Sequence, residues 1–156
     1  ANTSPTLTGR WDPQPWKAAE VAEINSFHAK SSDHRPRTAA KLLYDDAGIY
    51  VSFRVEDRYV ICTRHEHQTL TSKDSCVELY LQPFADRTGY FNFEMNCGGA
   101  LLSFWVTDPT RIAHAQSKRS DAVFRFRVIF GDANQHAHAR HPVALLRFDR
   151  KRPASY

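Results

Sequence analysis

Carboxylate and amide side chains alternate with bulky apolar residues in two stretches of the sequence. Asn92, Glu94 and Asn96 do so in GYFNFEMNCGGALLSFWV, residues 89–106, and Glu78 does so in DSCVELYLQP, residues 74–83. Carboxylates, amides and guanidinium groups can hydrogen-bond neighbouring hydroxyls in bidentate fashion, and flat aromatic rings pack against the apolar faces of sugar rings. Residues of these types gathered on one surface are typical of carbohydrate binding.

Strand periodicity decides whether these side chains share a surface. Apolar residues recur at every second position in segments 49–55, 76–81, 90–96 and 101–106, which is the pattern of a half-buried strand. Side chains two apart along a strand share a face. We therefore expect one binding face made of Arg54, Glu78, Asn92, Glu94, Asn96 and Trp105, with Tyr50 and Tyr80 beside them. The alternative is a second face that is only solvated or is covered by another sheet.

The connections between these segments predict the fold class. They carry turn chemistry in DDAG, QPFADRTG, NCGG and TDPT, and amphipathic helices do not intervene. We expect an all-β protein, an antiparallel β-sandwich of jelly-roll-like or immunoglobulin-like architecture, forming a single domain over residues 1–156. Only WKAAEVAEI, from Trp16, looks helical, and its alternative is an N-terminal strand with a short helical turn.

Hydropathy and charge narrow the range of partners. No apolar run approaches the roughly 20 residues that cross a bilayer, so we expect no membrane association. Residues 1–117 carry a net charge of −2 and residues 118–156 carry +6. The basic residues of this tail are interleaved with apolar ones, which favours a solvated strand face over a nucleic-acid partner.

Cysteine, aspartate and histidine side chains are all potential metal ligands in this sequence. Cys62, Cys76 and Cys97 fit no zinc spacing; we expect small buried hydrophobes, with a Cys62–Cys76 bridge as the open alternative. Carboxylates near strand ends offer oxygen ligands for structural calcium, although Asp-rich turns are more often only turns: Asp45, Asp46 and Asp57, with Glu56 and Asp74 nearby. Imidazoles alternate in two places where we expect no specific metal site, namely at His65 and His67 and at His136, His138 and His141.

Several segments together resemble carbohydrate-binding module family 9 and its stand-alone relatives. They are WDPQPWKAAEVAEI, TAAKLLYDDAGIYVSFRVED, SKDSCVELYLQP and GYFNFEMNCGGALL, spanning residues 10–108, whereas the tail 116–156 diverges. The resemblance implies a β-sandwich that binds saccharides without catalysis, is commonly associated with plant-polysaccharide-degrading systems such as glycoside hydrolases, and sometimes holds structural calcium. It also implies that Glu78 hydrogen-bonds sugar hydroxyls.

The sequence departs from this family where the sugar is gripped. Asn92 lies on the strand that corresponds to an arginine-bearing strand in family members. Where those members have one of the two tryptophans that clamp the sugar, this chain has Thr71-Ser72-Lys73. Trp105 or Tyr80 would then have to serve as the aromatic platform.

We expect docking of a xylan or glucan fragment by a non-catalytic, secreted or periplasmic protein, dimeric if a sheet edge is left exposed. The alternative is a sandwich that has lost sugar binding and binds metal or haem, or serves as a protein interface.

Overall fold

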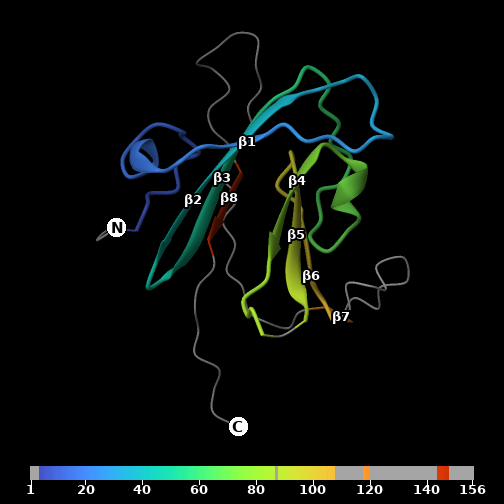
Figure 1. The fold of residues 1–156 in the computed structure, drawn as a ribbon. Coiled ribbons are helices and arrows are strands. Elements are labelled where there is room, and N and C mark those ends of the chain that lie inside the picture. The colour runs from blue at the N-terminus through green and yellow to red at the C-terminus, as the bar shows by residue number, and fades with distance from the viewer. Residues whose placement is uncertain (1–3, 87, 108–117, 120–143, 148–156) are drawn as a thin grey trace. The chain divides into compact units, whose positions relative to one another are not determined.

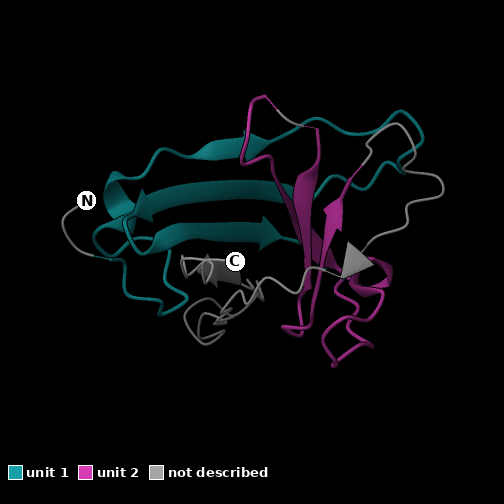
Figure 2. Ribbon diagram, turned by 90° about the horizontal axis from the view of Figure 1, so that it is seen from below, with its two compact units in different colours: residues 1–59, 124–156 teal, residues 60–123 magenta. Residues whose placement is uncertain are grey.

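The structure, a computed structural model, describes residues 4–86, 88–107, 118–119 and 144–147. The chain divides into two compact units, residues 1–59 with 124–156 and residues 60–123, which Figure 2 colours separately. Each unit holds one four-stranded antiparallel sheet (Figure 1). The described residues contain no α-helix, only two 3-10 turns, so the predicted all-β class with antiparallel sheets is confirmed and is consistent with a β-sandwich.

The sheet of the first unit is built around a long hairpin. Its strands lie in the order β1 (Ala22–Ile24), β2 (Arg37–Asp45), β3 (Gly48–Glu56) and β8 (Ala144–Arg147). At the hairpin tip the Asp45 carboxylate accepts hydrogen bonds from the backbone N–H groups of Ala47, at 2.8 Å, and Gly48, at 3.0 Å. An aspartate that binds the backbone just after it favours a turn, which explains why DDAG reverses the chain. The predicted strand 49–55 is confirmed as β3, whereas its partner β2 was not predicted.

The segment that begins at Trp16 is not an α-helix. It forms the 3-10 turn η1 (Trp16–Ala18) and then β1, so the alternative to a helix is correct. The Trp16 ring is buried against Tyr50, with Leu7 and Leu43 packed around them. Tyr50, which we expected beside the binding face, is therefore a core residue of the first unit.

The sheet of the second unit contains residues 89–106, the segment in which polar and apolar side chains alternate. It runs in the order β4 (Cys76–Leu81), β5 (Tyr90–Asn96), β6 (Leu101–Val106) and β7 (Lys118–Arg119), and the 3-10 turn η2 (Thr71–Lys73) precedes β4. Phe93, Met95 and Leu101 are buried on its apolar side. The predicted strands 76–81, 90–96 and 101–106 are confirmed.

The two described segments of the tail, residues 118–119 and 144–147, add one strand to each sheet. β8 pairs with β3 from Tyr50 to Phe53, so that part of the β3 edge is covered by the tail that we expected to diverge. The tail also contains AVFRFRVIFGD, residues 122–132, whose alternation predicts a further strand, but this segment lies outside the described residues. No helix in the described part of the chain is long and apolar enough to cross a membrane.

Candidate functional site

Strand pairing in the second unit brings the predicted polar residues of β4 and β5 together. Glu78 lies directly opposite Glu94, and Tyr80 lies opposite Asn92. Directly opposed residues of an antiparallel pair project to the same face, with Cβ atoms about 5 Å apart. We call this set, Glu78, Tyr80, Asn92 and Glu94, the polar face.

An exposed aromatic surface borders the carboxylates of the polar face. The side chain of Tyr80 is 56% exposed, and its ring centroid lies 5.6 Å from that of Tyr90 at an angle of 58°. The Tyr80 hydroxyl donates a hydrogen bond to Oε2 of Glu78. Burial, followed by this bond, raises the pKa of Tyr80, so the phenol keeps its proton. A neutral ring with an accessible surface next to hydrogen-bonding groups is a suitable platform for a sugar ring.

The amide and carboxyl groups of Asn92 and Glu94 form the floor of the polar face. Both residues are buried, 3% and 8% exposed, and Nδ2 of Asn92 donates to Oε1 of Glu94 at 3.2 Å. Oδ1 of Asn92 and Oε2 of Glu94 are also buried but make no hydrogen bond within the described residues. A buried polar atom left in this state costs about 1–3 kcal/mol. The floor therefore keeps two acceptor atoms available for a hydroxyl-bearing ligand.

The charge of the floor depends on whether the Glu94 carboxyl group is protonated. Burial raises the pKa of Glu94, and the neighbouring Glu78 carboxylate raises it further. The nearby polar side chains of Ser72, Asn92 and Thr71 offset this in part. Because the two carboxyl groups lie on adjacent strands and repel each other when ionised, Glu94 takes up a proton at a higher pH than an ordinary glutamate.

Trp105 lies on the opposite side of this sheet, so its expected place on the shared face is wrong. It pairs across strands with Phe91, and the two ring centroids are 4.5 Å apart. Its ring also closes over Gly89, where an added Cβ would come within 2.6 Å of it. The physical reason is the register, since the β5–β6 loop consists of residues 97–99 rather than the two glycines alone.

Arg54 belongs to the other sheet, which corrects its expected place beside Glu78. It lies on β3, opposite Ala39 of β2, and its guanidinium group pairs with Glu56 at 3.3 Å. There it lines a pocket of about 190 Å³ in the first unit, together with Trp11 and Arg37. Alternation along a strand cannot tell which sheet the strand joins.

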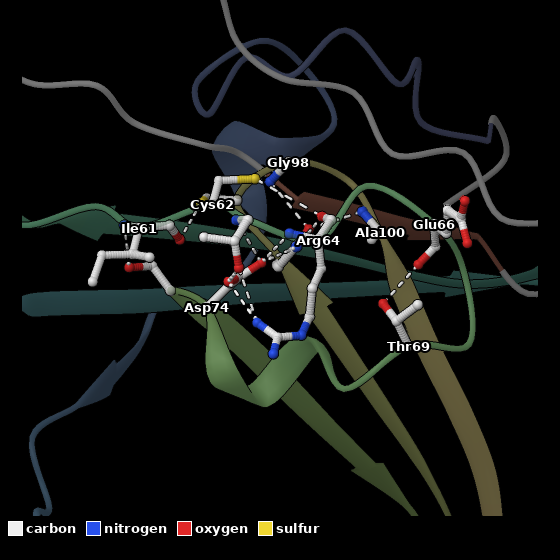
Figure 3. A network of polar contacts seen from close by, with 12 residues as sticks. Ile61, Cys62, Arg64, Glu66, Thr69, Asp74, Gly98 and Ala100 are labelled. Atoms are coloured by element: carbon white, nitrogen blue, oxygen red, sulfur yellow. Dashed lines mark hydrogen bonds and ion pairs between the residues drawn. The ribbon is translucent and has the colours of Figure 1, made fainter.

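Asn96 lies on the same side of β5 as Asn92 and Glu94, but its side chain belongs to a structural hydrogen-bond network (Figure 3). Its Nδ2 donates to the carbonyl of Arg64 at 2.7 Å and to Asp74 at 2.8 Å. Its Oδ1 accepts the backbone N–H groups of Gly98, at 3.1 Å, and Ala100, at 2.8 Å. With donor and acceptor both in use, this amide holds the end of β5 in place.

Asp74 is the centre of the same network. Its side chain is fully buried and accepts hydrogen bonds from the backbone N–H groups of Thr63 and Arg64, at 3.1 and 2.9 Å, and from the Thr63 hydroxyl at 2.7 Å. The Arg64 guanidinium group lies 3.2 Å away. These bonds, that of the Thr63 hydroxyl first, lower the pKa of Asp74 well below its usual value. Sequence reasoning placed Asp74 only among calcium ligands and missed this role.

The family relationship can now be stated, because the sequence profile of carbohydrate-binding family 9 matches residues 16–145. The chain belongs to carbohydrate-binding family 9. The predicted resemblance is thereby confirmed, and it extends beyond residue 108 into the tail. Carbohydrate binding is accordingly the general function of the family to which this chain belongs.

One solved structure similar to this family 9 chain comes from Bacteroides uniformis, and its name gives that protein a proposed role in carbohydrate binding. The two structures superpose with a TM-score of 0.58 at 16% sequence identity, over 84% of this chain and 57% of the other. The chain thus spans little more than half the length of that protein, and at this identity the likeness supports the fold alone. None of the curated proteins matches the sequence.

The structure does not gather the expected calcium ligands of this family 9 domain. Asp45 and Asp46 lie at the tip of the β2–β3 hairpin, whereas Asp57 follows its open end, roughly 30 Å away for strands of this length. Asp57 instead contacts His34 at 2.9 Å. Among the described residues no three His, Cys, Asp or Glu side chains could hold a metal ion. Calcium stays a prediction, and the tail histidines 136, 138 and 141 lie outside the described residues.

Proposed function

We propose that this family 9 domain binds neutral saccharides reversibly on the polar face, with the Tyr80 ring as the platform. The observation that carries this proposal is the floor of the face. There two buried acceptor atoms, Oδ1 of Asn92 and Oε2 of Glu94, make no hydrogen bond within the described residues, beside an exposed ring. Sugar hydroxyls donate and accept hydrogen bonds, so they can satisfy these atoms while the ring packs on tyrosine. Both atoms are covered, so binding involves a side-chain shift at the rim, where Tyr80 and Glu78 lie.

The charge of the polar face supports the choice of ligand. Glu78 and Glu94 are its ionisable carboxyl groups, and a negative surface repels uronic acids and other anionic sugars. Xylan and glucan main chains are neutral and offer equatorial hydroxyls together with flat apolar ring faces. We propose that fragments of these polymers are the ligands.

The positions of the two carboxyl groups favour binding over hydrolysis. Glycoside hydrolases place a pair of carboxyl groups on either side of the bond that is cleaved. Glu78 and Glu94 instead lie side by side on one sheet face, beneath whatever rests on it. We propose that the domain is not catalytic, and incubation with xylo-oligosaccharides should release no new reducing ends.

The proposal predicts that affinity falls in acid because Glu94 takes up a proton. The raised pKa of Glu94 places this fall above pH 4.5, the ordinary glutamate value. The ionised carboxylate is the stronger acceptor for a sugar hydroxyl. Isothermal titration calorimetry with xylohexaose and cellohexaose from pH 4 to pH 8 measures the change.

Glu94→Gln should weaken binding about tenfold at pH 7, which corresponds to the loss of one charged hydrogen bond, and should remove the pH dependence. Glu20→Gln, an exposed change in the first unit, is the matched control. If Glu94→Gln kept both the affinity and the pH profile of the unchanged protein, Glu94 would not contact the sugar.

A further inference from the structure

The three cysteines of the second unit lie close to one another at one end of its sheet. Cys76 begins β4, Cys97 follows the end of β5, and Cys62 lies on the segment that leads to η2. This segment is tied to the sheet, because Ser75 donates its backbone N–H to the carbonyl of Ile61 at 2.9 Å. All three cysteines are free thiols and half-buried.

Cys62 and Cys97 each contact the residue adjacent to the other. The thiol of Cys97 donates to the carbonyl of Ile61 at 3.2 Å, one residue before Cys62. The sulfur of Cys62 lies against Gly98, one residue after Cys97, where an added Cβ would come within 2.2 Å of it. The absence of a side chain at Gly98 thus makes room for the Cys62 sulfur, which Figure 3 shows next to this glycine.

We propose that Cys62 and Cys97 form a disulfide bond under oxidising conditions, and that Cys76 remains a free thiol. The bond joins the two sulfur atoms, and each thiol gives up one hydrogen. A small-molecule disulfide such as glutathione disulfide accepts the two electrons and two protons and leaves as two thiols. This pairing differs from the Cys62–Cys76 bridge that the sequence left open.

The surroundings of Cys97 favour a stable structural disulfide over one that is readily reduced. Burial, followed by the nearby Cys62, raises the pKa of Cys97 to about 11, so its nucleophilic thiolate is scarce at neutral pH. A thiol with a high pKa is also a poor leaving group, which slows reduction of its disulfide. The bond would fasten the segment that carries Thr63 and Arg64 to the β5–β6 loop, and so hold the Asp74 network closed.

Peptide mapping of the full chain tests the pairing without any variant. The protein is incubated with glutathione disulfide, its remaining thiols are alkylated, and it is digested with trypsin. Each cysteine then falls in a separate peptide, 59–64, 74–87 or 88–111. We expect 59–64 linked to 88–111, with 74–87 alkylated. A link between any other two peptides, or alkylation of all three, would overturn the proposal.

Thermal unfolding provides the second readout. Closure of a loop this long should raise the Tm of the oxidised protein by roughly 5–15 °C over the reduced protein. The difference should vanish in Cys62→Ser and persist in the matched control, Cys76→Ser. A difference that survives in Cys62→Ser, or vanishes in Cys76→Ser, would contradict a Cys62–Cys97 bond.

Discussion

Tyr80→Ala should weaken saccharide binding about 10- to 100-fold, because the change removes the exposed aromatic ring of the polar face. The residue is 56% exposed and has no place in the apolar side of the sheet, so the variant should fold with little change in Tm. Calorimetric titration with xylohexaose and cellohexaose measures the loss. Sugar binding without this ring would have to rely on hydrogen bonds that compete with water.

Two further tyrosine variants make the test of Tyr80 specific. Tyr80→Phe keeps the ring and loses only the hydroxyl that donates to Glu78, so it should retain most of the affinity. Tyr44→Ala removes a tyrosine of the first unit that is 73% exposed, and it should leave the affinity within about twofold of the unchanged protein. Equal affinities for Tyr80→Ala and Tyr44→Ala would place the sugar elsewhere.

Asp74→Asn should lower the Tm of the second unit by on the order of 10 °C, because one amide cannot accept every hydrogen bond that the carboxylate accepts. The change also leaves the Arg64 guanidinium group without its anionic partner. Asp46→Asn, an exposed aspartate in the hairpin turn of the first unit, is the matched control and should change Tm by only a few degrees. Circular dichroism during heating measures both.

The lowered pKa of Asp74 also fixes how stability depends on pH. Its folded-state pKa is below its unfolded value of 3.8, so its stabilising effect is present above that value and is lost as pH falls through the folded pKa. Glu94 acts in the opposite direction, since its pKa is raised in the fold and its contribution is lost as pH rises. Asp74→Asn should therefore flatten the acid side of the stability curve; an unchanged acid limb would show that the carboxylate is not responsible.

Local alternation predicted the strands but not the register of one hairpin. A two-residue turn at the paired glycines would place Trp105 opposite Asn92, on the polar face. The chain instead closes a three-residue loop, in which Asn96 donates its N–H to the carbonyl of Ala100 and Gly99 adopts a left-handed φ of 88°. Because side chains alternate with period two, this one-residue difference turns Trp105 to the other face.

Assignment of strands to sheets also lies beyond local patterns. The strands that carry Arg54 and Glu78 show the same alternation, yet they belong to different sheets. β8 is a four-residue strand in a stretch of the tail without clear alternation, and only pairing with β3 defines it. Asn96 alternates in step with Asn92 and Glu94, as a residue of the binding face would. Its side chain instead donates a hydrogen bond to the carbonyl of Arg64, 32 residues earlier in the chain, and local alternation cannot predict such a contact.

The most direct test of saccharide binding on the polar face is a titration of the 15N-labelled protein with xylohexaose and cellohexaose, followed by amide chemical shifts. We expect saturable shifts concentrated in β4, residues 76–81, and β5, residues 90–96, with the side-chain amide of Asn92 among them. Shifts concentrated around Arg54 and Trp11 in the first unit, or a spectrum that does not change, would contradict this account.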